Sequence, residues 1–127
     1  MALIGLGIDL VDIERAEAML APRRRRVLDR LLTPEELAYV ERMRHPARHL
    51  AVRLAAKEAV YKAFQAIDGC RAIGWREIEV VRGAFGRPSI RLHGLAARIH
   101  AEQGSPAIYL SLTHSDLTAG ATAILER

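Results

Sequence analysis

The chain has 127 residues, with 19 lysines and arginines against 15 aspartates and glutamates, which gives a formal net charge of +4. This length favours a single domain over residues 1–127, and the 50% hydrophobic content is that of a globular protein. Apolar runs are too short for a membrane span of ~20 residues, and the first residues lack the pattern of a signal peptide. The lone Cys70 excludes an intrachain disulfide. We therefore expect a cytoplasmic protein.

The first half of the chain is expected to be mainly helical after an initial strand. Alternating apolar residues predict a strand over 3–10, and a helix is expected over 13–21. Residues 33–36, Thr-Pro-Glu-Glu, form a helix start in which the threonine is the N-cap and the second glutamate completes a capping box. That helix should end before Pro46, and a longer helix is predicted over 47–67.

The second half of the chain changes to the two-residue period that is typical of strands. One helix is expected there, over 94–103, with Gly104 as its stop. The strands are predicted over 75–82, 89–93, 108–112 and 119–125, the first two joined by the turn GAFGRP. This order of elements indicates an α+β fold in which helices pack on a mainly antiparallel β-sheet.

The positive charge is concentrated in one segment. Residues 21–32, APRRRRVLDRLL, hold five arginines and one aspartate, which leaves 14 basic and 14 acidic residues elsewhere. Such a patch suits an acidic partner, which can be a nucleic acid, an anionic membrane or an acidic protein, although it also fits a solvated helix end. No aromatic residue lies among these arginines, so a base-stacking platform is poorly supported.

The long helix carries an unusual set of charges opposite an alanine-rich stripe. At 100° per residue the polar side is formed by Arg53, Lys57, Glu58, Tyr61, Lys62 and Gln65. An ordinary surface helix would explain it, since Glu58 and Lys62 have the favourable i,i+4 order worth about 0.2–0.5 kcal/mol. The alternative is a site in which a carboxylate binds a divalent cation and the flanking cations bind phosphate oxygens.

Such a site needs a second carboxylate, and Asp9 is the best candidate. It lies in an apolar strand, on the opposite side from Ile8 and Leu10, and a carboxylate is costly to bury there without a partner. Another interpretation is a surface carboxylate on the exposed face of an edge strand. Asp12 and Glu14 could serve as the second carboxylate too, but they look more like acidic residues at a helix start.

His114 is the third polar residue in an apolar context. It has the same strand parity as Ile108, Leu110 and Leu112, and a lone histidine there is more often structural than catalytic. The sequence has no Cys/His spacing typical of zinc, no Walker loop, no G-x-G-x-x-G and no G-x-S-x-G.

Four motifs together match a known family. They are GIDLVDIER (7–15), RLAAKEAVYKAF (53–64), GRP (86–88) and LSLTHSD (110–116). In their order and spacing the chain resembles the bacterial holo-[acyl-carrier-protein] synthases, which are 4′-phosphopantetheinyl transferases, over essentially its whole length. The resemblance implies their fold and their Mg²⁺-dependent reaction, in which coenzyme A donates phosphopantetheine to a serine of apo-acyl carrier protein and 3′,5′-ADP is released.

The resemblance also assigns roles to the acidic and basic residues of the proposed metal site. Asp9 and Glu58 look like the carboxylates that hold Mg²⁺ on the pyrophosphate of coenzyme A. Lys62 resembles a catalytic phosphate ligand that steadies developing charge. Glu58 is also the candidate to accept the serine proton, directly or through a metal-bound water.

A second group of residues matches the family's donor-binding positions. Arg53 resembles a residue that contacts the nucleotide phosphates. Gly86, Arg87 and Pro88 look like the loop that lies against the adenosine. His114 matches a catalytic and donor-binding histidine near the pyrophosphate.

The family resemblance also implies a binding partner for the arginines and an oligomeric state for the chain. Acyl carrier proteins are acidic and dock on the family's first helix, where Arg15 stands at the matching position, followed by Arg23 and Arg25 in the arginine run. Family members are homotrimers with shared active sites. By that analogy Asp9 and Glu58 lie on one chain and the GRP loop on the next.

Two other hypotheses compete with the transferase. A small basic nucleic-acid-binding module would use the run from Arg23 to Arg26 and would bind with steep salt dependence, indifferent to Asp9→Ala. A non-catalytic homologue would bind coenzyme A as a structural ligand, but the intact Asp9, Glu58 and Lys62 argue against it.

Overall fold

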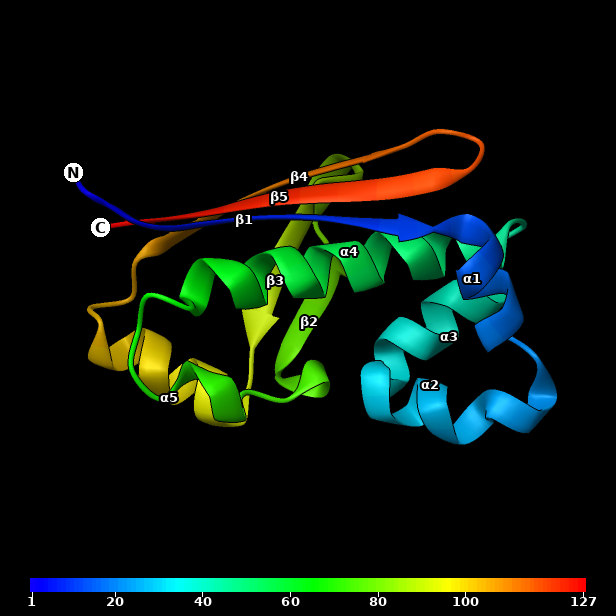
Figure 1. Ribbon diagram of the computed structural model, residues 1–127, viewed down its shortest axis with the longest axis horizontal. Coiled ribbons are helices and arrows are strands. Elements are labelled where there is room, and N and C mark those ends of the chain that lie inside the picture. The colour runs from blue at the N-terminus through cyan, green and yellow to red at the C-terminus, as the bar shows by residue number, and fades with distance from the viewer.

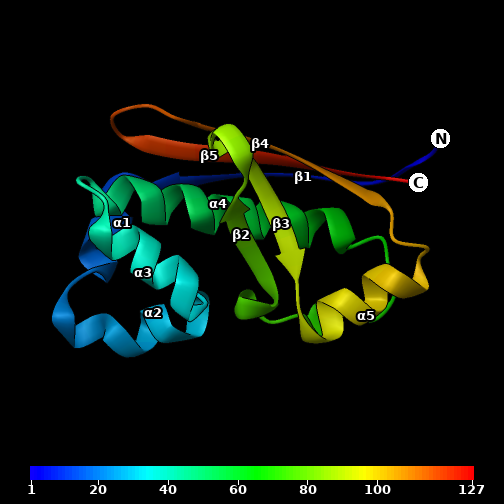
Figure 2. The ribbon, with the colours of Figure 1, turned by 180° about the vertical axis from the view of Figure 1, so that it is seen from behind.

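A long helix crosses the molecule between two small antiparallel sheets. Figure 1 shows the computed structural model, which describes residues 1–127, with helix α4 lying beneath the longer strands. Those strands form a sheet in the order β1-β5-β4, and β2 and β3 form a separate hairpin on the other side of α4 (Figure 2). The strands are β1 (Leu3–Asp12), β2 (Ile78–Arg82), β3 (Pro88–Leu92), β4 (Ala107–His114) and β5 (Thr118–Glu126). The predicted α+β class with antiparallel pairing is confirmed, in two sheets rather than one.

The predicted capping box at the start of α3 is confirmed, and the short helix α2 was not predicted. Thr33 caps α3 through a complete capping box, and the short helices α1 to α3 lie together at one end of α4 (Figure 1). The helices are α1 (Ile13–Met19), α2 (Arg25–Leu31), α3 (Pro34–Arg42), α4 (Pro46–Phe64) and α5 (Gly94–Glu102). None of them is long and apolar enough to cross a membrane.

Two predicted boundaries are wrong, because the long helix expected to reach residue 67 ends at Phe64 and a strand begins later than expected. The strand expected from residue 75 begins only at Ile78, because residues 75–77 form a single 3₁₀ turn. The Glu77 carboxylate stabilises that turn by accepting hydrogen bonds from the backbone N–H groups of Gly74 and Ala96, at 3.2 and 2.9 Å. The turn brings Trp75 toward α4 instead of placing it in the hairpin.

Close contact between β1 and α4 depends on small residues. The buried side of α4 is rich in alanine, and Gly5 and Gly7 of β1 lie directly against its backbone. A Cβ built on Gly7 would overlap the carbonyl oxygen of Ala59, and one on Gly5 would overlap that of Ala63. Glycine is therefore required at both positions to keep β1 seated on the helix.

Gly7→Ala is expected to lower the free energy of unfolding by about 3 kcal/mol, the upper part of the range for overpacking, because the strand and helix must separate. Gly83→Ala is the matched control, since Gly83 has an ordinary negative φ and a Cβ there would meet its nearest neighbour at 3.6 Å. Urea unfolding of the two variants measures the difference. Equal stabilities would contradict the packing described for Gly7.

In β1 the large apolar side chains point away from helix α4, whereas in a usual core strand they point inward. Leu6, Ile8 and Leu10 face away from α4 and are 58%, 64% and 70% exposed. Gly7 and Asp9 face the helix, so the predicted placement of Asp9 opposite Ile8 and Leu10 is confirmed. The outward face leaves an apolar row on an edge strand.

Glu79, at the inner side of β2, couples the fold to pH. Its carboxylate is 2% exposed and accepts hydrogen bonds from Thr33 Oγ1 at 2.9 Å and from His93 Nε2 at 2.8 Å. Burial alone would raise its pKa, but the hydrogen bonds from His93 and Thr33 and the charges of His93 and Arg91 outweigh burial and lower the pKa. A carboxylate with a lowered folded-state pKa stabilises the fold above its unfolded pKa.

The free energy of unfolding is therefore expected to fall as the pH drops from about 4.5 through the folded-state pKa of Glu79. Glu79→Gln should be less stable than the wild type at neutral pH and should lose less stability on acidification. Urea unfolding at a series of pH values from 7 to 3 tests this. Parallel wild-type and variant curves would show that Glu79 does not contribute to the acid dependence.

Candidate functional site

Strand β1 and helix α4 bring together three of the predicted site residues. Asp9 faces the helix, and Lys62 Nζ donates to Asp9 Oδ1 at 3.2 Å and to the Ile8 carbonyl at 3.0 Å. Glu58 lies one turn before Lys62 on α4, and the Asp9 charge acts on it. The pairing leaves the Asp9 side chain 20% exposed and that of Lys62 41% exposed, so both remain accessible to a ligand.

The electrostatics of Glu58 favour binding of a cation. Burial raises the pKa of its carboxyl, the neighbouring negative charge of Asp9 raises it further, and Lys62 acts in the opposite direction. A carboxylate whose ionisation is disfavoured by a neighbouring negative charge is stabilised by a positive ion placed near both groups.

The donor set fits Mg²⁺ chemically. Hard oxygen donors from one or two carboxylates, completed by water and substrate phosphates, are what Mg²⁺ takes in phosphate-handling enzymes. No group of three or more His, Cys, Asp or Glu side chains that could hold a metal ion is present. An ion held by Asp9 and Glu58 would thus depend on a bound phosphate for further ligands.

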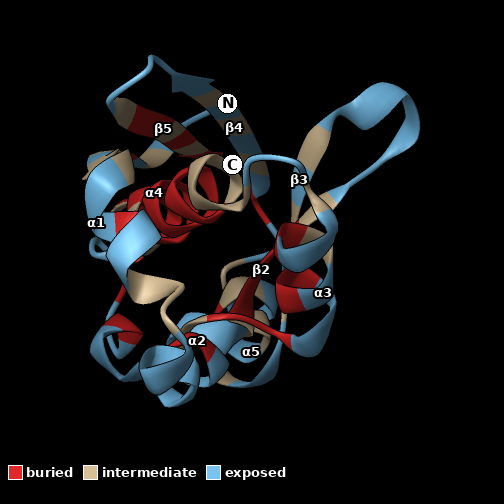
Figure 3. Ribbon diagram, turned by 90° about the vertical axis from the view of Figure 1, so that its right-hand side faces the viewer, coloured by how far each residue is buried: buried red, intermediate tan, exposed pale blue.

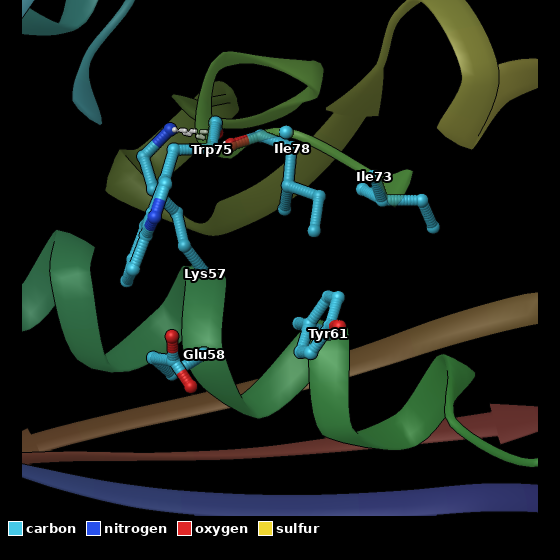
Figure 4. Close-up of a pocket in the computed structure, with 7 residues that line it drawn as sticks. Lys57, Glu58, Tyr61, Ile73, Trp75 and Ile78 are labelled. Atoms are coloured by element: carbon cyan, nitrogen blue, oxygen red, sulfur yellow. Dashed lines mark hydrogen bonds between the residues drawn. The ribbon is translucent and has the colours of Figure 1, made fainter. Parts of the chain in front are cut away.

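Two cavities meet at Glu58. The small cavity, of about 230 Å³, is shown in Figure 4 and is lined by Lys57, Glu58, Tyr61, Ile73, Gly74, Trp75 and Ile78. The large cavity, of about 670 Å³, is lined by Asp9, Leu10, Val11, Arg15, Ala18, Met19, Arg24, Val27, Leu31, Leu54, Glu58 and Trp75. Glu58 and Trp75 are the two residues that line both.

The expected polar side of α4 is only partly exposed. Lys57 is 1% exposed, and its ammonium donates to Glu36 Oε1 at 2.7 Å and to the carbonyls of Trp75 and Ile78 at 3.0 and 2.6 Å. Glu36 in turn accepts from the backbone N–H of Val80 at 2.8 Å. Lys57 therefore ties α4 to α3 and to the start of β2, and the interpretation of the polar side as an ordinary helix surface is wrong for Lys57.

Arg53 is also buried, at 2% exposure. Its guanidinium lies over the Tyr39 ring at 4.1 Å from the centroid and donates to the His49 carbonyl at 3.4 Å, while its Nε has no partner. The interpretation as an ordinary helix surface is thus wrong for Arg53 as well. Its contact with nucleotide phosphates stays a prediction.

Three other predicted donor-binding residues, Arg87, Pro88 and His114, line a third cavity. This basic cavity, of about 450 Å³, is lined by Arg48, His49, Val52, Arg82, Arg87, Pro88, Leu110, Ser111, Leu112, Thr113 and His114. It contains no carboxylate, and burial together with the neighbouring Arg53, Arg82 and Arg48 lowers the pKa of His49. Such a positive environment suits an anionic group.

The two clusters of predicted residues remain separate within one chain. The basic cavity, with Arg87 and His114, shares no residue with either cavity at Glu58. Gly86 belongs to the exposed turn between β2 and β3 and has a left-handed φ of 72°. The structure therefore does not bring the GRP loop to Asp9 and Glu58 of the same chain.

The arginines near the large cavity differ in their surroundings. Arg15 on α1 lines the cavity, and so does Arg24, which the sequence did not distinguish from its neighbours. Arg23 is exposed, whereas Arg25 is held by Glu41 at 2.9 Å and Asp29 at 3.4 Å. The positive charges available at the cavity are thus those of Arg15 and Arg24.

Comparison with known proteins decides the family. The profile of the 4′-phosphopantetheinyl transferase superfamily matches residues 5–117. The chain belongs to that superfamily. Its relatives include the holo-[acyl-carrier-protein] synthase of Geotalea daltonii, which is 39% identical over 97% of this chain and 98% of the relative.

Solved synthase structures have the same fold. That of the Neisseria meningitidis holo-[acyl-carrier-protein] synthase superposes with a TM-score of 0.87 at 31% identity, covering 99% of this chain and 100% of the other. A synthase–CoA complex from Chronobacterium ammoniagenes has a TM-score of 0.82 at 32% identity, covering 99% and 98% of the two chains. The resemblance based on the motifs is confirmed, and the chain is an enzyme of the phosphopantetheinyl transferase family.

The sequence patterns did not single out Trp75, which lies beside Glu58 in the structure. The expectation of a strand from residue 75 would have made Trp75 one of its alternating side chains. A signal was available, because Gly74 precedes it and Glu77 follows at capping-box spacing, as at a helix start.

Proposed function

We propose that this enzyme transfers 4′-phosphopantetheine from coenzyme A to a serine hydroxyl of apo-acyl carrier protein, with Mg²⁺, and releases 3′,5′-ADP. The observation that carries the proposal is the cluster of Asp9, Glu58 and Lys62, in which Glu58 lies at the junction of the two cavities. The relatives named holo-[acyl-carrier-protein] synthase and the neighbour solved with CoA support the choice of donor and acceptor.

The cluster provides what transfer of a phosphoryl-type group requires. The serine oxygen forms a bond to the phosphorus that carries pantetheine, the bond from that phosphorus to the 5′-phosphate oxygen breaks, and 3′,5′-ADP leaves. Mg²⁺ held by Asp9 and Glu58 would neutralise negative charge on the pyrophosphate oxygens. Lys62 contributes a further positive charge to the leaving phosphate.

Glu58 is the proposed acceptor of the serine proton. A carboxylate at this position can take the proton directly or through a metal-bound water. The location of Glu58 on both cavities supports this role, because the donor and the acceptor could approach it from different sides.

We also propose that the active enzyme is a homotrimer with shared sites. The GRP loop and His114 would then reach the donor bound at Asp9 and Glu58 of a neighbouring chain. The separation of the two clusters in one chain supports this arrangement, as does the exposed apolar row of Leu6, Ile8 and Leu10. Apolar side chains gathered on one surface are typical of a protein contact.

The carrier protein is proposed to dock at the arginines around the large cavity. Arg15 and Arg24 line it, and the exposed Arg23 extends the positive surface. Charge attraction of this kind accelerates encounter with an acidic partner and weakens with salt. Arg25, which is already paired with Glu41, is expected to contribute less.

Product analysis tests the proposed reaction. Chromatography should detect 3′,5′-ADP when enzyme, coenzyme A, Mg²⁺ and apo-acyl carrier protein are combined, in a one-to-one ratio with modified carrier. Omitting the carrier or adding EDTA should prevent its formation. Release of 3′,5′-ADP without modification of the carrier would contradict the proposed transfer.

A further inference from the structure

Trp75 occupies an unusual position for the chain's single tryptophan. It is 38% exposed and stands between the two cavities, sharing with Glu58 the border of both. Figure 4 shows its indole extending from the segment before β2 toward α4, next to Glu58. Any molecule whose reacting group lies at Glu58 must therefore pass close to this ring.

Hydrogen bonds from a side chain of helix α4 hold the backbone at Trp75 in place. Lys57 Nζ donates to the carbonyl of Trp75 at 3.0 Å and to that of Ile78 at 2.6 Å, so both ends of the 75–77 turn are bound by one ammonium group. The Gly74 N–H to Glu77 hydrogen bond closes the same turn. A ring on a turn restrained in this way is a preformed wall for a ligand.

The lining of the small cavity beyond this ring suits an uncharged ligand. Apolar and aromatic side chains contribute most of its lining, namely Tyr61, Ile73, Trp75 and Ile78. The Lys57 ammonium already binds three protein oxygens, and Glu58 stands at the junction with the other cavity. The cavity thus disfavours phosphate and favours an apolar or amide-containing chain.

The large cavity is also lined mainly by apolar side chains, but it differs from the small one in its arginines. Arg15 and Arg24 line it, which suits an acidic molecule, and the small cavity has no arginine. A donor whose pyrophosphate lies at Asp9 and Glu58 has one uncharged end, the thiol-terminated arm, and one highly charged nucleotide end. The small cavity matches the uncharged end better than the large cavity does.

We propose that Trp75 is a substrate-binding residue that contacts the thiol-terminated arm of the donor and directs it into the small cavity. This inference rests on the proposed function for its donor, but it concerns binding and not transfer. It assigns the small cavity to the arm and leaves the large cavity to the acidic acceptor.

The fluorescence of Trp75 reports on the inference directly. With Mg²⁺ present, coenzyme A should change the emission intensity and wavelength, because the arm displaces water from the indole. 3′,5′-ADP, which has the nucleotide but no arm, should bind by calorimetry and leave the emission nearly unchanged. Equal changes with both ligands, or no change while calorimetry shows bound coenzyme A, would overturn the proposal.

Variants separate the contact from a general effect on the fold. Trp75→Ala should raise the Kd for coenzyme A about tenfold and leave the Kd for 3′,5′-ADP unchanged, and Trp75→Phe should restore most of the affinity. Equal weakening of both ligands, or none, would contradict the assignment.

A matched pair of substitutions distinguishes the two cavities. Ile73→Phe partly fills the small cavity and should weaken coenzyme A binding, whereas Val27→Phe in the large cavity should not. Circular dichroism and calorimetric binding of 3′,5′-ADP verify that each variant is folded. The reverse ranking would place the arm in the large cavity and overturn the proposal. Normal coenzyme A binding without transfer to any carrier would contradict the proposed function and leave this inference standing.

Discussion

Asp9→Asn and Glu58→Gln are each expected to lower the rate of phosphopantetheine transfer by at least about a hundredfold. A metal ion on a phosphoryl group contributes several kcal/mol of charge stabilisation, and each 1.36 kcal/mol corresponds to a factor of ten. Loss of either carboxylate removes one of the two protein oxygens proposed to hold the ion. Initial rates with saturating carrier measure the effect.

Both variants should remain folded, which makes the loss interpretable. The Asp9–Lys62 pair is partly exposed, and such pairs contribute about 0–1 kcal/mol to stability. Asp12→Asn is the matched control, because Asp12 is an exposed carboxylate at the end of the same strand. A rate for Asp9→Asn within a few fold of the wild type, or an equal loss in Asp12→Asn, would contradict the metal site.

Lys57→Met is expected to destabilise the protein by about 3–5 kcal/mol, the cost of removing one partner from a buried ion pair. The side chains of Lys57 and Glu36 are 1% and 0% exposed, and the buried Glu36 carboxylate would lose its ion-pair partner. Glu36 would keep its hydrogen bonds from the backbone N–H groups of Thr33 and Val80, so part of the network would survive. Urea unfolding measures the change.

Lys62→Met is the matched control for that experiment. Both lysines lie on α4 and each is paired with a carboxylate, but the Lys62 side chain is 41% exposed. Lys62→Met should therefore cost less than about 1 kcal/mol in stability and should instead reduce transfer. If the two variants were equally stable, the distinction between a structural Lys57 and a functional Lys62 would be wrong.

Much of the site could be predicted because its geometry is local. The i,i+4 spacing places Glu58 and Lys62 on one side of α4. Strand alternation places Asp9 opposite Ile8 and Leu10, and the structure pairs it with Lys62. Alternation fixes which residues share a face but not which face is covered, so the outward position of the apolar row on β1 could not be foreseen.

The burial of Arg53 and Lys57 was not predictable in the same way. A helical period separates polar from apolar sides, and the polar side is normally turned to water. In this fold α4 lies between the three-stranded sheet and the elements β2 and α3, and Figure 3 shows it buried along most of its length. Charged side chains on its second face are therefore enclosed by segments that follow or precede it in sequence.

Contacts in the site between residues that are far apart in the sequence could not be predicted from a sequence pattern either. Capping signals located α3 through Thr33 and Glu36, but nothing indicated that Glu36 would also receive Lys57 from another helix. Likewise, the turn that brings Trp75 beside Glu58 depends on Lys57, which binds its carbonyl across the fold. Local sequence patterns predicted most of the helices and strands, whereas tertiary contacts determine which residues line the cavities.

The mass of an intact apo-acyl carrier protein, measured after incubation with this enzyme, coenzyme A and Mg²⁺, tests the central claim most directly. The account predicts a gain of one phosphopantetheine, with the modified serine identified by fragmentation, and no gain with EDTA, Asp9→Asn or Glu58→Gln. An unchanged mass with several carriers, or a gain that persists in both variants, would contradict it.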